Sequence, residues 1–256
     1  TLDAAVQIAL LNNPSIQVIY KDLDIAYADV IQAGMLENPT LNATVLYSEE
    51  GTGQHTEFSI EQNVLDILLL PLRKKLAREE YNQVKLQVGD AVLEIINETK
   101  TAFFILQANQ QLTGLQKDVL RAAEAAEELA ARQFEAGNIN TLDLASHQAA
   151  LHDAKLEWMR NEAELFSNQE NLHRLMGLTG ANPKLNIEAD LSKLPLSDPD
   201  LSDVIRTALA QRLDLAAARQ ELVIFKKALF LARTEAVPDI SGSMVKESSP
   251  DENPHV

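Results

Sequence analysis

Histidine is the first residue type to consider for chemistry in this sequence, because imidazoles bind transition metals and transfer protons near neutral pH. The 256-residue sequence contains five histidines: His55, His147, His152, His173 and His255. His147 and His152 are five positions apart, so they do not share one face of a helix, and no set of Asp, Glu and His has metal-ligand spacing. We therefore expect no metal site.

Other catalytic signatures are also missing from the sequence. The absence of cysteine excludes disulfides, thiol catalysis and Cys-containing zinc sites. The sequence contains no Gly-rich phosphate loop and no arrangement that argues for a Ser-His-Asp triad. Single carboxylates such as Glu124, Glu127, Glu128 and Asp153 are typical of solvated helix faces. The sequence therefore predicts a protein that is not an enzyme and binds no cofactor.

The composition narrows the class of protein further. Thirty-eight acidic residues against 22 basic ones give a formal net charge of −16, which argues against binding to nucleic acid or to anionic lipid through a polybasic face. Apolar residues make up 46 %, but aromatic residues only 5 %, and there are only 9 glycines. This balance is typical of long helices. No apolar run reaches the roughly 18 residues of a membrane-spanning helix.

The elements that must position any site are mainly helical. Apolar residues recur at steps of three and four, which predicts a helix over 1–36 that is interrupted at Asn13–Pro14, and a long helix over 72–135. The segment 136–141 contains Gly137 and forms a tip between antiparallel helices, and Thr141 is expected to begin the next helix, over 142–177. A Pro-rich connector follows over 178–199.

Residues 39–63 have a different period. Leu41, Ala43, Val45 and Tyr47 alternate with mostly polar residues, and Phe58 and Ile60 alternate with Glu57, Ser59 and Glu61. The pattern predicts a β-hairpin, joined by an acidic loop at Glu49–Glu50, with one apolar and one polar face. Because an isolated hairpin is marginally stable in water, its apolar face must find lipid or other strands.

The sequence also contains an internal repeat with an offset of 199 residues. The identical pairs are Leu2/Leu201, Ala9/Ala208, Leu10/Leu209, Leu23/Leu222, Ile25/Ile224, Ala33/Ala232 and Pro39/Pro238. We therefore divide the chain into a first structural repeat, 1–199, and the start of a second, 200–256. The second contains a helix over 201–236, the beginning of a strand over 238–245 and a polar tail, so the chain is interpreted as truncated within its second repeat.

These patterns together resemble the TolC-like outer-membrane efflux proteins of Gram-negative bacteria. The motifs that carry the resemblance are Leu2-x-x-Ala5-Val6-x-x-Ala9-Leu10-x-x-Asn13-Pro14, Ala33-Gly34-x-x-x-Asn38-Pro39-x-Leu41, Phe134-x-x-Gly137-x-x-x-x-Leu142-Asp143-Leu144, Leu172-x-x-Leu175-x-Gly177-Leu178 and Ala208-Leu209-x-x-Arg212-x-Asp214-Leu215. Their order and duplication cover nearly the whole chain. Leu213 departs from the pattern, since Pro is common there.

The resemblance implies a fold and a function. The fold would be mainly α, a long antiparallel helical hairpin forming the wall of an α-barrel, with a β-hairpin that contributes to a trimeric transmembrane β-barrel. The function would be that of the outer-membrane channel of a tripartite efflux or type I secretion system, a passive conduit for small molecules, metal ions or polypeptides. The implied partners are two further copies of the chain, a periplasmic membrane-fusion adaptor, an inner-membrane pump and outer-membrane lipid.

The resemblance also assigns residues to these contacts. It places the adaptor contact, at the periplasmic entrance, on the tip residues Arg132, Phe134, Gly137, Asn138, Ile139, Thr141 and Asp143. It directs Tyr47 and Phe58 to lipid, and Glu57 and Glu61 to the lumen. From the residues alone, the tip is equally a plain helix-turn-helix corner and the two glutamates a solvated hairpin face.

A second function remains open. A long antiparallel coiled coil also suits a soluble scaffold or interaction protein with no transport role, in which the hairpin is a minor surface feature. The alternation over 41–61 and the second Pro-marked strand start at Pro238 favour the channel, because a scaffold needs neither. A chain that ends within its second repeat is expected to form no pore by itself and to self-associate through uncovered faces.

Overall fold

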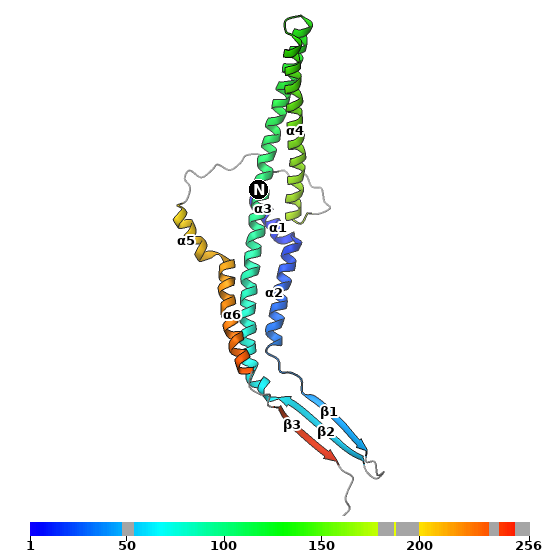
Figure 1. Ribbon diagram of the computed structural model, residues 1–256, viewed down its shortest axis with the longest axis vertical. Helices are drawn as coiled ribbons and strands as arrows, with labels where there is room; N and C mark the ends of the chain where they lie inside the picture. Colours follow the sequence, from blue (N-terminus) through cyan, green and yellow to red (C-terminus); the bar gives the residue numbers. More distant parts are fainter. Residues whose placement is uncertain (48–53, 179–186, 188–199, 236–240, 249–256) are drawn as a thin grey trace, which may run out of the picture. The chain divides into compact units, whose positions relative to one another are not determined.

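The computed structural model describes residues 1–47, 54–178, 187, 200–235 and 241–248. Its elements, in chain order, are α1 (Leu2–Asn12), α2 (Pro14–Gln32), β1 (Thr40–Tyr47), β2 (Gln54–Asn63), α3 (Val64–Glu135), α4 (Thr141–Leu175), α5 (Leu201–Gln211), α6 (Leu213–Glu235) and β3 (Ser241–Ser248) (Figure 1). The expected mainly helical fold, with one long helical hairpin and a β-hairpin, is confirmed. The acidic loop at 49–50, nearly all of the connector and the polar tail from 249 lie outside the described residues.

The chain divides into two compact units. One consists of Thr1–Ile19 and Gly89–Thr207, and the other of Tyr20–Val88 and Ala208–Val256. Helix α3 contributes to both units. None of the helices in the described ranges is long and apolar enough to cross a membrane.

The first unit is a helical hairpin with its core where α1, α3 and α4 meet. Figure 1 shows α4 running back along the distal part of α3. The buried core cluster comprises Ala5, Ala9, Ala102, Phe103, Leu106, Leu172, Leu175 and Met176. Alanines on α1 allow its backbone to approach the larger side chains closely, and Leu106 is completely buried.

The break between α1 and α2 falls at Asn13, as the Asn-Pro sequence predicts. Proline cannot donate to a helical carbonyl, but its fixed φ suits the first position of a helix, so α2 begins at Pro14. The Asn13 Oδ1 atom accepts a hydrogen bond from the main-chain N–H of Ser15 at 2.8 Å. This side chain therefore satisfies one of the N–H groups that the start of α2 leaves without an intrahelical partner.

The C-terminal end of α4 packs against this break. Gly177 follows α4 and has a φ of +68°. A Cβ atom at Gly177 would lie 2.3 Å from the main-chain oxygen of Asn12. Only glycine therefore fits here, for both a conformational and a steric reason.

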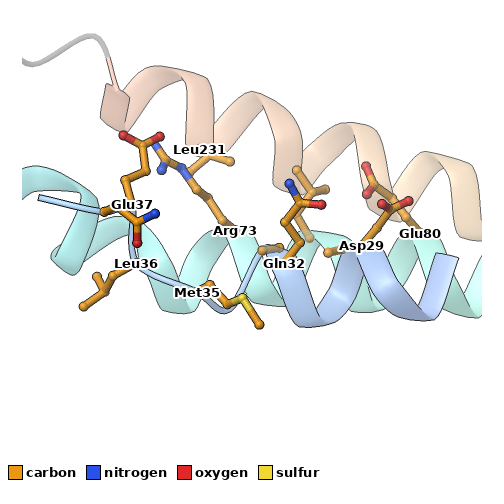
Figure 2. Close-up of a pocket in the computed structure, with 12 residues that line it drawn as sticks. Asp29, Gln32, Met35, Leu36, Glu37, Arg73, Glu80 and Leu231 are labelled. Carbon is orange, nitrogen blue, oxygen red and sulfur yellow. The ribbon is translucent and has the colours of Figure 1, made fainter. Parts of the chain in front are cut away.

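The second unit contains an antiparallel sheet of order β1-β2-β3. In the β1–β2 register Ala43 is opposite Phe58 and Thr44 is opposite Glu57. Strand β3, from the far end of the chain, pairs with the other edge of β2, and Lys246 is opposite Phe58. The helical part of this unit brings α2 and α6 against the first part of α3 (Figures 1 and 2).

Helix α3 begins earlier than the sequence led us to expect. We placed its start at Leu72 because Pro71 reads as a helix boundary, but α3 begins at Val64 and contains Pro71. The cause is a cap: the side-chain oxygen of Asn63 accepts hydrogen bonds from the N–H groups of Leu65, at 2.9 Å, and Asp66, at 3.4 Å. The helix therefore starts directly at the end of β2, and Pro71 removes one hydrogen bond inside it.

The helix expected over 201–236 is also divided, into α5 and α6, with Arg212 between them. Arg212 is the position that corresponds to Asn13 at the offset of 199 residues. The guanidinium Nε of Arg212 donates to the Asp214 carboxylate at 3.0 Å, and Asp214 accepts from the N–H of Leu215 at the start of α6. The second copy thus keeps the break of the first, although it lacks the proline.

Candidate functional site

The tip of the helical hairpin is built by a glycine turn. The N–H of Gly137 donates to the carbonyl of Phe134 at 2.9 Å, and the N–H of Asn138 donates to the carbonyl of Gln133 at 2.8 Å. These two bonds form a Schellman motif, which satisfies the last carbonyls of α3 and requires a left-handed residue. Gly137 supplies it, with a φ of +76°.

Helix α4 is capped by Asn140 and not by Thr141, the residue that we expected to begin it. The sequence suggested that the Thr141 hydroxyl begins α4, whereas the Asn140 side chain accepts a hydrogen bond from the N–H of Asp143 at 2.9 Å. Asn140 has the extended backbone of an N-cap, with φ −90° and ψ 173°, which leaves Thr141 as the first helical residue. The Asp143 carboxylate lies in the first turn, where it favours the positive end of the helix dipole.

The structure brings the expected tip residues together in the last turn of α3, the connection that follows it and the first turn of α4. Most of them are exposed, and Ile139 is half-buried: Arg132, Phe134, Gly137, Asn138, Ile139, Thr141 and Asp143. Arg132 forms an ion pair with Glu128 one turn earlier in α3. Apart from Ile139, these residues are exposed, so a partner could reach them.

Two apolar side chains near the tip were not among our expected contacts. Leu142 is 74 % exposed and Leu129 is 57 % exposed, and Phe134 is 40 % exposed. Apolar side chains exposed in this way beside polar ones are typical of partner-contact surfaces. Leu142 stands in the quoted tip motif, which was the signal that could have identified it.

The sheet separates the expected strand residues onto two faces. Glu57 and Glu61 are four residues apart in β2, so their side chains lie on the same face of the strand. Their partners in β1 are Thr44 and Thr40. Phe58 lies on the other face, with Ala43 beside it. The side chain of Tyr47 lies outside the described residues, and its Cα is opposite that of Gln54.

The apolar face of the sheet is uncovered within the described parts of the chain. Its exposed residues are Leu41, Val45, Phe58, Ile60 and Met244. Met244 is 84 % exposed, and Lys246 from the same strand shares this face with Phe58. The sequence reasoning missed β3 as the third strand of this sheet, because its residues alternate too weakly to reveal which face is apolar.

A cavity of about 650 Å³ lies where α2, α3 and α6 meet in the second unit. Figure 2 shows Asp29 from α2, Arg73 and Glu80 from α3, and Leu231 from α6 among the side chains that line it. The Arg73 guanidinium forms ion pairs with Asp66 at 2.9 Å and with Glu235 at 3.2 Å. Desolvation acts to lower the pKa of Arg73, but its bonds with Glu235 and Asp66 outweigh this and raise the pKa above its ordinary value.

A second polar cluster joins α3 to α6. The Glu79 carboxylate accepts hydrogen bonds from Lys227, with which it also forms an ion pair, and from Gln220 Nε2 at 2.6 Å. These bonds, that of Lys227 first, hold the pKa of Glu79 below its ordinary value of 4.5.

Among the described residues, no group of three or more Asp, Glu and His could hold a metal ion. His147 and His152 are exposed on α4, whereas His173 is buried, and its Nδ1 lies 3.2 Å from a carboxylate oxygen of Glu170.

Comparison with known proteins identifies the class to which this geometry belongs. The model of the family "Outer membrane efflux protein" matches residues 5–178. That match includes the hairpin, its tip and the first two strands, and it covers more than half of the chain. The chain belongs to the outer membrane efflux protein family, which confirms the resemblance found in the sequence.

Individual relatives agree with this assignment. The chain is 26 % identical over 255 residues to the cobalt-zinc-cadmium resistance protein CzcC of Cupriavidus metallidurans, covering 95 % of this chain and 57 % of CzcC. A membrane protein from Pseudomonas aeruginosa has a similar structure, with a TM-score of 0.76 and 18 % identity, covering 97 % of this chain and 64 % of that one. CusC, a protein that forms a transmembrane channel, gives a TM-score of 0.74 and 17 % identity, covering 100 % of this chain and 66 % of CusC. The chain thus spans less than two thirds of the length of each.

Proposed function

We propose that this chain belongs to the outer-membrane channel component of a tripartite efflux or type I secretion system. The channel would be a passive conduit through the periplasm and the outer membrane of a Gram-negative bacterium, with energy supplied by an inner-membrane pump. One observation carries the proposal: the same chain has a long helical hairpin with an exposed tip and a sheet whose apolar face no described residue covers. Family membership supports it.

The sheet provides the membrane end of the proposed channel. Closing a barrel takes about eight strands or more, so three strands must be pooled with those of other copies, for which we propose a homotrimer. Phe58 and Tyr47 would then face outer-membrane lipid, and Glu57 and Glu61 would face the aqueous lumen. The register supports this division, since it puts Phe58 and Glu57 on opposite faces of β2.

The tip provides the periplasmic entrance. A membrane-fusion adaptor would contact the exposed side chains around Gly137, including Arg132, Phe134 and Asp143. Movement of α3 against α4 at this end would open the channel when the adaptor engages. The open space around Gly137, where an added Cβ would meet no atom within 4 Å, is consistent with a surface that a partner covers.

Metal cations are the substrate class that we favour among small molecules, metal ions and polypeptides. CzcC is named for resistance to cobalt, zinc and cadmium. The net charge of −16 would also make the lumen attractive to cations. Reversal potentials across a bilayer under a salt gradient test this: cation selectivity is expected, and anion selectivity would refute it.

The alternative of a soluble coiled-coil scaffold is less well supported. In a soluble scaffold the apolar side chains of the sheet would be exposed to water with no partner to cover them. Leu41 is 71 % and Met244 is 84 % exposed.

Two substitutions on adjacent residues of β2 separate the two functions. In the gene product that carries this sequence, Phe58→Arg should reduce insertion into the outer membrane, because arginine on a lipid-facing strand costs about 2–4 kcal/mol at mid-depth. Glu57→Arg, on the opposite face, should insert normally. Membrane fractionation and bilayer conductance measure the difference. Equal insertion of both variants, or a protein that is soluble without detergent and gives no conductance, would contradict the channel.

A further inference from the structure

The unit that contains the sheet also has a groove to which the proposed channel function assigns no role. It has a volume of about 480 Å³ and lies between α2 and α3. Tyr27, Val30 and Ile31 of α2 line one side, and Lys74, Arg78 and Tyr81 of α3 line the other. We call it the basic groove.

The two cations of the basic groove differ in their surroundings from the neighbouring Arg73. Arg73, next to Lys74 in sequence, is held by two carboxylates. Among the described residues, neither Lys74 nor Arg78 takes part in an ion pair. They are four residues apart, so they project from the same face of α3 and leave their charge available to a ligand.

A third cation extends this positive stripe. The Lys85 ammonium lies 4.9 Å from the centre of the Tyr81 ring, one turn beyond the groove. The three cations would attract an anion, and Arg with Lys is well suited to a phosphate group.

The remainder of the lining is apolar and aromatic. The Tyr27 and Tyr81 rings lie 5.8 Å apart, and Ile31 and Met35 expose 45 % and 64 % of their surface. A small hydrated anion would gain nothing from these groups. A ligand that carries a phosphate and an apolar tail would cover them and pair with the cations at the same time.

Gly34 fixes the position of Lys74 in this groove. A Cβ atom at Gly34 would lie 3.1 Å from Cδ and 3.2 Å from Nζ of Lys74, so the lysine side chain lies against the glycine backbone. The φ of Gly34 is outside the left-handed region, so a Gly34→Ala variant can keep the fold. Its Cβ would displace the lysine side chain and would also lie 3.3 Å from the main-chain oxygen of Ile31.

We propose that the basic groove binds the phosphate headgroup of an anionic phospholipid. Lys74 and Arg78 would pair with the phosphate, and the beginning of an acyl chain would lie over Ile31 and Met35. Met35 is followed within a few residues by β1, whose uncovered apolar face belongs to the same unit. The groove therefore lies close along the chain to the part that is suited to lipid.

Titration of the 256-residue chain with dihexanoyl phosphatidylglycerol, kept below its micelle concentration, tests the proposal. Isothermal titration calorimetry should show saturable binding at one site that weakens as NaCl is added. Lys74→Gln and Arg78→Gln should each weaken binding roughly tenfold, the loss of one charge-assisted contact. Lys75→Gln, which alters an exposed lysine of the same helix outside the groove, is the matched control and should bind as the parent does.

Two further measurements make the outcome decisive. Gly34→Ala should weaken lipid binding while the chain stays folded, with a cooperative urea transition like that of the parent. Inorganic phosphate should bind far more weakly than the lipid, because it cannot cover the apolar lining. Equal affinity for inorganic phosphate, or equal lipid affinity of the Lys74, Arg78 and Lys75 variants, would overturn the assignment.

Discussion

The side-chain amide of Asn13 donates a hydrogen bond of 2.9 Å to the main-chain carbonyl of Leu175, which is 162 residues away in sequence. The same side chain accepts the N–H of Ser15 at the start of α2. Asn13 is only 5 % exposed, so water does not replace either bond unless the unit opens. One residue thus begins one helix and satisfies the end of another.

Replacement of Asn13 by alanine should therefore destabilise the unit that contains α1 and α4. The Leu175 carbonyl and the Ser15 N–H would each be left without this partner, which predicts a loss of about 1–3 kcal/mol. Urea unfolding followed by circular dichroism measures it. Asn97→Ala, at an exposed position of α3 in the same unit, is the control and should not destabilise. Equal urea midpoints for the two variants would contradict the role of Asn13.

Two glycines with left-handed backbones give a matched test of packing at the ends of α4. Gly137 and Gly177 have φ values of +76° and +68°. Alanine at Gly137 meets no atom within 4 Å, so only the backbone strain of about 1–2 kcal/mol is expected. Alanine at Gly177 adds a clash with Asn12, since its Cβ would lie 2.3 Å from the main-chain oxygen.

Gly177→Ala should consequently lower the free energy of unfolding by more than Gly137→Ala does. The comparison cancels the strain that both variants share and leaves the clash. Urea unfolding of the two variants under identical conditions provides the measurement. If both lose the same stability, the close approach between α4 and α1 is not maintained in solution.

Acid should weaken the unit that contains α6, through Glu79. Hydrogen bonds from Lys227 and Gln220 lower the folded-state pKa of Glu79 below 4.5, so its stabilising contribution is fully present above that pH. The contribution is lost as the pH falls through the folded-state pKa, because the carboxyl group becomes protonated. Stability measured from neutral pH to below 4.5 should therefore fall more steeply in the parent than in Glu79→Gln. Parallel curves would exclude this linkage.

The tip is expected to be essential for transport and dispensable for assembly. In the gene product that carries this sequence, Gly137→Leu should abolish efflux and leave the amount of trimer unchanged, because the added side chain projects into open space where the adaptor would bind. Gly114→Leu is the control. A Cβ at Gly114 also meets no atom within 4 Å, but Gly114 lies inside α3 and away from the tip. Metal or drug tolerance of cells, together with cross-linked trimer, reports the two properties. Normal efflux from Gly137→Leu would remove the tip from the adaptor contact.

Local signals explain which parts of the fold could be predicted from the sequence. The two long helices follow from their apolar spacing, and the tip follows from Gly137, whose turn type is fixed by residues within a few positions. The faces of β1 and β2 follow from the alternation of apolar with mostly polar residues, so Phe58 and Glu57 could be separated before any pairing was known.

Contacts between distant residues could not be predicted in this way. Nothing around Asn13 indicates that its amide reaches Leu175, and nothing near Gly177 indicates that Asn12 lies against it. The pairing of β3 with β2 also lacked a signal, because Val245 and Lys246 give each face one residue of the unexpected kind. The groove at Lys74 and Arg78 could not be predicted either, because the residues that line its other side come from α2.

The central position of β2 determines when the sheet can be completed. Its pairing with β1 needs only a short connection, whereas its pairing with β3 joins residues that are separated by the whole of α3 to α6. Closing so long a loop slows the search for the native arrangement, and local contacts form first. During synthesis the helical hairpin can therefore fold while one edge of β2 is still unpaired. A holding chaperone that shields this edge until β3 has been made would prevent aggregation in the interval.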